Sequence, residues 1–177
     1  ETGPIAFSKS NSDFEKVPNK KYVLVLPIMP INTQTDKNAR GVITNDYNIL
    51  WSEKFLSDIY KITSKNKFLT AIKQKRFKGK QYYYKPYLDY IDTLSKKTDV
   101  QILDPGIGLE MIYDMVDGAI CFPFTSAAFF SNKYKTPTIF YDVSNQLNAS
   151  EEYTHGVKCL RDFNSLEKWI QGLSKNF

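Results

Sequence analysis

The sequence has few of the residues that build metal sites, disulfides or histidine-based catalytic dyads. Of its 177 residues, two are cysteine and one is histidine. Cys121 and Cys159 both fall in apolar stretches, where a free cysteine commonly packs as a small hydrophobic residue. No paired-cysteine or histidine-rich spacing indicates zinc, and His155 stands alone in a predicted loop. The sequence therefore predicts no metal site and offers only weak support for histidine catalysis.

Long apolar runs are also missing. No stretch is long enough to span a bilayer, and the N-terminus lacks the apolar core of a signal peptide. With 42 % apolar and 24 % charged residues, the composition is typical of a soluble globular protein, and we expect a cytoplasmic location. A chain of this length suits one well-buried domain rather than two.

The net charge of +5 is spread along the chain. The densest basic cluster is Lys73-Gln-Lys-Arg-Phe-Lys-Gly-Lys80, and three tyrosines follow it at 82–84. Basic residues beside aromatic ones can suit a nucleic-acid strand, but lysines also gather at a helix end before a glycine. We favour the helix end and predict no nucleic-acid partner. Moderate basicity also suits a ligand that carries phosphates.

Apolar, β-branched runs alternate with amphipathic ones along the chain. Strands are expected at Lys21–Met29, Gln81–Lys85, Val100–Leu103, Ala119–Phe122, Thr138–Tyr141 and Gly156–Leu160. Helices are expected at Tyr47–Ser64, Lys67–Phe77, Tyr87–Lys96, Ile107–Met115, from Thr125-Ser126, and from a cap at Asn164 or Ser165 to Leu173. The polar connection from Pro30 to Asp46 is long for a compact domain, which is typical of functional or mobile loops.

This alternation predicts an α/β fold: a Rossmann-like, three-layer domain with a mostly parallel six-stranded sheet. We assign residues 20–177 to this single domain and residues 1–19 to a tag remnant (Glu1-Thr2-Gly3) and a flexible segment. If the strands take the common order 3-2-1-4-5-6, a crevice lies between the first and the fourth strand. The loop after Met29 and the segment Phe124-Thr125-Ser126 then meet at that crevice.

The stretch Gly118–Asp142 organises these expectations. A buried strand leads through Pro123 and Phe124 into a helix that opens at Thr125-Ser126. The first N–H groups of such a helix are free, and with the helix dipole they favour an anion. The alternative is an ordinary N-cap, because Thr and Ser cap many helices that bind nothing.

The chain resembles the C-terminal, donor-binding half of a GT-B glycosyltransferase, in the branch that includes polysaccharide-type sialyltransferases and other surface-polysaccharide enzymes. Four short features in order carry the resemblance. They are YVLVLP in the first strand, Lys85-Pro86-Tyr87, the Asp104-Pro105-Gly106 turn with Glu110, and Val116-Asp117-Gly118 followed by FTSAA and KTPTI. The resemblance covers roughly residues 21–173.

The resemblance implies a role for each matching residue. Thr125, Ser126 and neighbouring backbone N–H groups, including that of Ala127, would hold the nucleotide phosphate. Lys85 would neutralise phosphate charge, and Tyr87 stands where related enzymes often place a phosphate-contacting histidine. Asp104, Pro105, Gly106 and Ile107 would line the base pocket, and Glu110 would face the ribose hydroxyls. Each residue also has a purely structural alternative, such as a turn cap for Asp104 or a solvated helix position for Glu110.

The resemblance further implies a donor half that binds a nucleotide sugar, needs no cofactor, and is inactive without an acceptor-binding domain absent from this chain. No catalytic residue can be assigned. Peripheral membrane association of a full-length protein is left open. Two alternatives remain. The first is a non-catalytic interaction module with a vestigial site, and Tyr87 in place of the usual histidine favours it. The second is half of a nucleotide-sugar epimerase.

Overall fold

The computed structural model describes residues 14–33, 46–75, 82–147, 150 and 154–175. The expected tag remnant, most of the connection from Pro30 to Asp46, and the end of the basic cluster lie outside these residues. Phe14, from the segment expected to be flexible, is buried against the domain.

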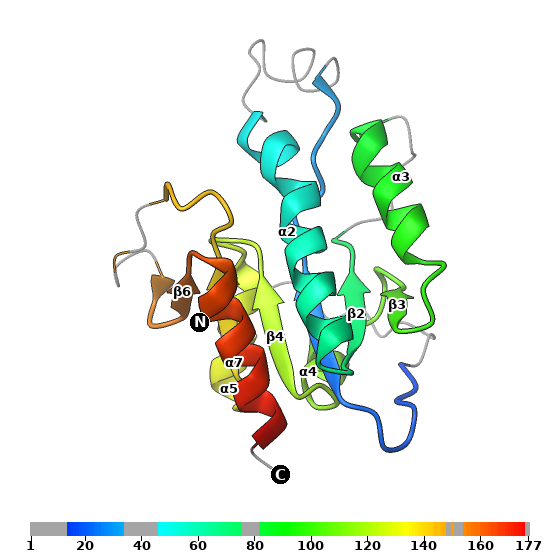
Figure 1. Cartoon of the computed structure of the whole chain (residues 1–177), viewed down its shortest axis with the longest axis vertical. Coiled ribbons are helices and arrows are strands. Elements are labelled where there is room, and N and C mark those ends of the chain that lie inside the picture. Colours follow the sequence, from blue (N-terminus) through cyan, green and yellow to red (C-terminus); the bar gives the residue numbers. More distant parts are fainter. Residues whose placement is uncertain (1–13, 34–45, 76–81, 148–149, 151–153, 176–177) are drawn as a thin grey trace, which may run out of the picture.

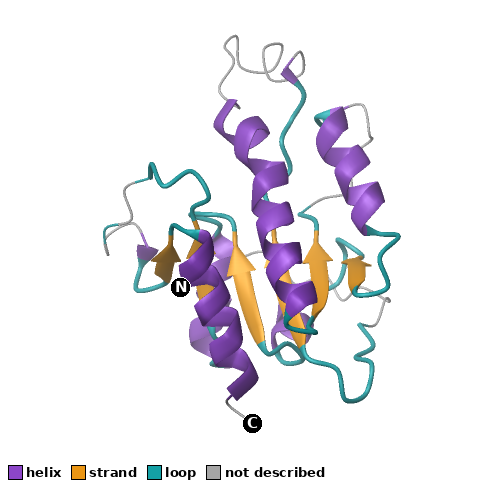
Figure 2. Ribbon diagram, viewed as in Figure 1, coloured by secondary structure: helices purple, strands orange, loops and turns teal. Residues whose placement is uncertain are grey.

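The sheet has six parallel strands in the order β3-β2-β1-β4-β5-β6, which confirms the predicted fold class and is the common order on which the crevice expectation was conditional. Figure 2 shows the central strand arrows pointing toward one edge. The strands are β1 (Tyr22–Leu26), β2 (Leu69–Lys73), β3 (Val100–Leu103), β4 (Gly118–Cys121), β5 (Thr138–Tyr141) and β6 (Lys158–Leu160).

Helices cover both faces of the sheet, with α2 and α7 in front of it and α4 and α5 behind it in Figure 1. The front layer contains α2 (Asp46–Lys65), α3 (Lys85–Leu94) and α7 (Phe163–Lys175). The back layer contains α4 (Leu109–Tyr113), the 3₁₀ helix η2 (Ser126–Phe130) and α5 (Ser131–Tyr134). The central strand β1 is buried along its whole length: Val23 and Val25 face the front core, and Leu24 and Leu26 face the back core. A strand buried on both faces needs a continuous apolar sequence, which YVLVL supplies.

The position of β2 corrects two predictions. Lys67–Phe77 was expected to be helical, but it contains β2. Of the strand expected at Gln81–Lys85, the described residues 82–85 form no strand, and Gln81 lies outside the described residues. The reason is a left-handed residue: Lys67 has φ 60°, and its N–H bonds to the Ser64 carbonyl at the end of α2. Glycine normally marks such a helix end, so a lysine there gives no signal in the sequence.

Two helix starts also differ from expectation. The helix expected from Thr125-Ser126 is a five-residue 3₁₀ helix, followed directly by the four residues of α5. At α7 the capping side chain belongs to Asp162, whose Oδ1 accepts a hydrogen bond from the Ser165 N–H at 2.8 Å. Asn164 and Ser165 therefore lie inside the first turn rather than at the cap.

Candidate functional site

The sheet reverses its winding at the boundary between β1 and β4. The two strands pair in parallel, with Leu26 opposite Cys121, and the Phe122 N–H donates to the Leu26 carbonyl at 2.9 Å. The chain leaves β1 toward β2 and β3, whereas it leaves β4 toward β5 and β6. In open α/β sheets the carboxyl edge at such a switch point is where ligands bind.

The segment Pro123–Ser126 forms a tight turn at this edge. The Thr125 N–H donates to the Phe122 carbonyl at 3.2 Å, and Phe124 adopts φ 59°. Proline followed by a residue with positive φ is the geometry of a type II turn. Pro123 is buried, whereas 43 % of the Phe124 surface is exposed.

Polar groups follow this turn directly. Thr125 lies at the N-cap position of η2, but its side chain makes no capping hydrogen bond. The Ala128 N–H donates to the Thr125 carbonyl at 3.0 Å, whereas those of Ser126 and Ala127 donate to no backbone carbonyl among the described residues. A helix this short has a small dipole, so the anion-site expectation depends on these two N–H groups and the nearby hydroxyls rather than on a macrodipole.

A buried tyrosine fixes the first turn of η2. The Tyr113 hydroxyl, on α4, donates to the Ala127 carbonyl at 3.0 Å and lies 3.9 Å from the Cys121 sulfur. Burial raises the pKa of the Tyr113 phenol well above its usual value, and burial also raises the pKa of the Cys121 thiol to about 12. Both groups are therefore neutral, and their role is to position the turn.

The turn after β3 forms a second part of the carboxyl edge. The Gly106 N–H donates to Oδ1 of Asp104 at 2.6 Å, so this carboxylate organises its own turn. Lys73, the last residue of β2, is largely buried, and its ammonium donates to the Pro105 carbonyl at 2.8 Å. Burial lowers the pKa of Lys73, an effect that the Asp104 carboxylate partly opposes. Ile107 is buried in the back core.

The remaining predicted site residues lie on helices. Lys85 is exposed at the start of α3 and pairs with Asp89 at 2.7 Å. Glu110 is half-buried in the first turn of α4.

Tyr87 is completely buried in the front core, so its ring is out of reach of a ligand in this conformation. Burial raises the pKa of the Tyr87 phenol, and the Gln74 side chain partly opposes this rise. Among the described residues, no group lies in hydrogen-bond geometry to the Tyr87 hydroxyl. We do not include Tyr87 in the proposed site.

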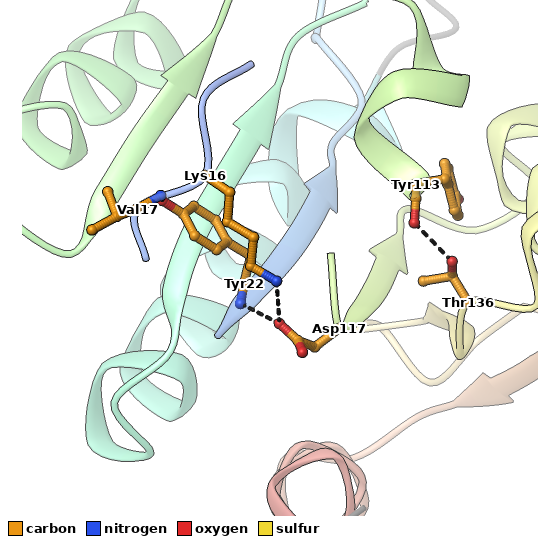
Figure 3. Close-up of polar contacts among 6 residues, drawn as sticks. All are labelled: Lys16, Val17, Tyr22, Tyr113, Asp117 and Thr136. Atoms are coloured by element: carbon orange, nitrogen blue, oxygen red, sulfur yellow. Dashed lines mark hydrogen bonds and ion pairs between the residues drawn. The ribbon is translucent and has the colours of Figure 1, made fainter. Parts of the chain in front are cut away.

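A pocket of about 390 Å³ lies at the opposite, amino edge of the sheet, between Lys16, Asp117, Tyr134 and Lys135. Figure 3 shows that polar groups there bind one another. Asp117 accepts a hydrogen bond from the Tyr22 N–H at 2.7 Å and pairs with Lys16 at 3.7 Å. The Thr136 hydroxyl donates to the Tyr113 carbonyl at 2.9 Å. These contacts hold the segment before β1 against the domain, so we place the functional site at the carboxyl edge instead.

Sequence reasoning missed two residues at the carboxyl edge. Lys73 was missed because the segment around it was predicted to be helical. The apolar run that ends at Lys73 could have indicated a strand with a lysine at its carboxyl end. Phe124 was treated only as a turn residue, because nothing in the sequence shows that it adopts a left-handed conformation with an exposed ring.

The fold and the edge geometry define a doubly wound α/β domain with a candidate ligand site at the β1–β4 switch point. A family profile described as "Polysaccharide biosynthesis PFTS motif protein" matches residues 1–170, and the chain belongs to this family. The tetrapeptide Pro-Phe-Thr-Ser occurs at positions 123–126, which is the turn at the end of β4.

Other comparisons add little. No curated protein matches the chain. Among solved structures, the chain is similar to Thermosulfurimonas dismutans KpsC, a beta Kdo 2,4 transferase, with 10 % identity and a TM-score of 0.43. The similarity covers 71 % of this chain and 35 % of that one. No helix among the described residues has both the length and the apolar character to cross a membrane.

Proposed function

We propose that this domain binds the nucleotide-sugar donor of a glycosyltransferase that acts in polysaccharide biosynthesis. The observation that carries the proposal is the position of the Pro123–Ser126 motif. A family of polysaccharide biosynthesis proteins is described by this tetrapeptide, and here it lies at the carboxyl edge where the sheet changes direction.

The chemistry of the edge is suited to such a ligand. The N–H groups of Ser126 and Ala127 and the hydroxyls of Thr125 and Ser126 are hydrogen-bond partners for phosphate oxygens. The turn Asp104–Ile107 follows β3, which lies beyond β2 on one side of β1. Its backbone groups can form hydrogen bonds to the nucleotide base of the donor. Lys73 holds this turn in place through the Pro105 carbonyl.

The proposed ligand is a substrate, and no cofactor is required by the proposal. Transfer of a sugar needs an acceptor and a group that activates it, and we assign neither to the described residues. We therefore propose that the domain acts together with an acceptor-binding domain and transfers nothing by itself. This leaves binding, rather than turnover, as the property to measure.

Binding is tested by titrating CMP, UDP and UDP-glucose into the ¹⁵N-labelled protein up to millimolar concentrations. The expected result is chemical-shift change concentrated at residues 124–128 and 104–107. Ser126→Asp places a negative charge on an exposed side chain beside the proposed phosphate position, and should weaken binding about tenfold or more.

Asn132→Asp is the matched control. It adds the same charge at an exposed position of α5, after η2 in the sequence, and should leave the affinity within about twofold. The proposal is contradicted if none of the three compounds binds. It is contradicted also if Ser126→Asp and Asn132→Asp change the affinity equally.

A further inference from the structure

We propose that the Phe124 ring is the surface against which the sugar ring of the donor packs. This inference rests on the proposed function and names the part of the ligand that the Pro123–Ser126 turn meets. Four observations support it: exposure, backbone conformation, support from behind, and direction along the sheet.

Phe124 is an exposed aromatic residue in a conformation that side chains avoid. Its φ of 59° is normal for glycine and unfavourable for other residues because the side chain approaches the backbone carbonyl. The turn itself requires only a residue that tolerates positive φ, and 43 % of the Phe124 residue surface is exposed. Packing on Phe140 therefore accounts for only part of the Phe124 surface, and the rest is available to a ligand.

The ring is held from behind by other aromatic rings. Its centroid is 6.0 Å from that of Phe140, a fully buried residue of β5. Phe140 in turn contacts Phe129 edge-on at 6.5 Å, and Phe129 contacts His155 at 5.1 Å. A ring supported in this way presents its exposed part in a fixed position, which lowers the entropy lost when a ligand packs on it.

The direction in which the Phe124 side chain leans indicates which part of the donor it contacts. In the sheet, β3 lies three strands from β4 on one side, about 14 Å at ordinary strand spacing, and β5 is the neighbour on the other side. Phe124 contacts β5, so it points away from the proposed base turn Asp104–Ile107. In a nucleotide sugar the phosphates separate the base from the sugar. With phosphate at Ser126 and Ala127 and the base toward β3, the sugar falls on the β5 side.

The surroundings also match a saccharide ring. Its C–H face is apolar and carries small positive charges that an aromatic face attracts, whereas its rim carries hydroxyls. The hydroxyls of Thr125 and Ser126 adjoin the Phe124 ring in sequence.

The test compares sugar-bearing and bare nucleotides on the complete chain. Dissociation constants for UDP, UDP-glucose, CMP and CMP-sialic acid are measured by NMR titration for the wild type and for Phe124→Leu and Phe124→Tyr. Leucine keeps the apolar bulk and the backbone strain but removes the flat ring, and tyrosine restores the ring. Phe163→Leu is the control, because Phe163 is exposed to a similar degree (38 %) but lies on α7.

The wild type should bind at least one sugar nucleotide more tightly than its bare counterpart. Phe124→Leu should weaken binding of that sugar nucleotide about tenfold, in line with the loss of one aromatic stacking contact, and leave the bare nucleotide unchanged. Phe124→Tyr and Phe163→Leu should behave like the wild type. If Phe124→Leu does not fold, Phe124→Gly, which suits the positive φ, should show the same selective loss.

Three results overturn the inference. Equal weakening of bare and sugar-bearing nucleotides by Phe124→Leu would place the ring at the base or phosphate. Unchanged binding of all four ligands, or no preference for sugar nucleotides in the wild type, would remove the ring from the site. Failure of every nucleotide to bind the wild type would instead reject the proposed function, and this inference with it.

Discussion

Replacing Gly118 with alanine should destabilise the domain, because α7 packs directly on this residue. A Cβ atom at position 118 would lie 2.6 Å from Cδ1 of Leu173 and 3.0 Å from the far edge of the Trp169 ring. Real Cβ atoms do not approach other heavy atoms this closely, so α7 must shift or Leu173 must change rotamer. Gly118 is the first residue of β4, the strand that ends at the Pro123–Ser126 turn.

The size of the effect follows from two opposing contributions. Overpacking a filled core destabilises by about 1–3 kcal/mol. Leu173 is only 6 % exposed, but it also lines the pocket at the amino edge of the sheet, so a change of its rotamer can relieve part of the clash. Gly118 has no positive φ, so alanine also restricts the unfolded chain and returns about 0.4–1 kcal/mol. The net loss in the free energy of unfolding is then between about 0 and about 2.6 kcal/mol and centred near about 1 kcal/mol, which is about 2–4 °C in Tm for a domain of this size.

Urea unfolding followed by circular dichroism measures this loss, and Gly172→Ala is the matched control. Gly172 lies on the same helix, next to Leu173, and a Cβ there meets nothing within 4 Å. In a helix interior this substitution should stabilise by about 0.5–1 kcal/mol. The reasoning is refuted if Gly118→Ala stabilises the domain as Gly172→Ala does. It is refuted also if the double variant Gly118→Ala/Leu173→Ala loses the full sum of the two single effects, because removing the Leu173 side chain should relieve the clash.

Two further predictions concern buried polar groups. Asp117→Ala leaves the buried Tyr22 N–H without its acceptor and should lower the free energy of unfolding by about 1–3 kcal/mol. Asp89→Ala removes an exposed ion pair and should lower it by less than about 1 kcal/mol. The urea unfolding midpoints of the two variants test this difference. Raising the pH above 9 should destabilise the protein, because burial raises the pKa of Cys121 from 9.0 to about 12, so the unfolded chain loses this proton first. For this thiol the free energy of unfolding then falls by about 0.7 kcal/mol per pH unit at pH 9, rising toward about 1.4 kcal/mol per pH unit at pH 10, and Cys121→Ala should flatten the slope between these values.

Each of these predictions has an outcome that contradicts it. Equal losses for Asp117→Ala and Asp89→Ala would mean that the Tyr22 N–H finds another partner. For the alkaline slope, Cys159→Ala is the comparison. Burial raises the pKa of this partly buried thiol as well, so Cys159→Ala should flatten the slope less than Cys121→Ala does. A slope that Cys121→Ala leaves unchanged would show that other groups, such as the buried tyrosines, account for the whole dependence.

Much of the fold follows from local sequence. YVLVL, GAIC and TIFY are short apolar runs that only a doubly covered parallel strand accommodates, and amphipathic segments separate them. Parallel strands need helical crossovers of one hand, which limits the possible strand orders but leaves more than one. The switch-point position of the Pro-Phe-Thr-Ser segment therefore followed only once the common order 3-2-1-4-5-6 was assumed, and the structure has that order.

Other features depend on backbone conformations that these residues rarely adopt. Lys67 and Phe124 both take a positive φ without being glycine. At Lys67 this separates α2 from the strand β2, where a second helical segment was expected, and at Phe124 it leaves an aromatic side chain partly exposed. The misplaced second strand also affected the predicted site residues. Lys85 was expected at a strand end but lies on α3, whereas Lys73 is the residue at the end of β2.

For every strand except β2, the sequence alone determined which segments are buried strands and in which order they alternate with helices, because burial and secondary-structure period are local properties of the chain. Only the tertiary structure decided that Tyr87 is enclosed in the front core and that Phe124 leans on β5. Those outcomes depend on contacts between residues far apart in sequence, where packing overrides what a single segment prefers.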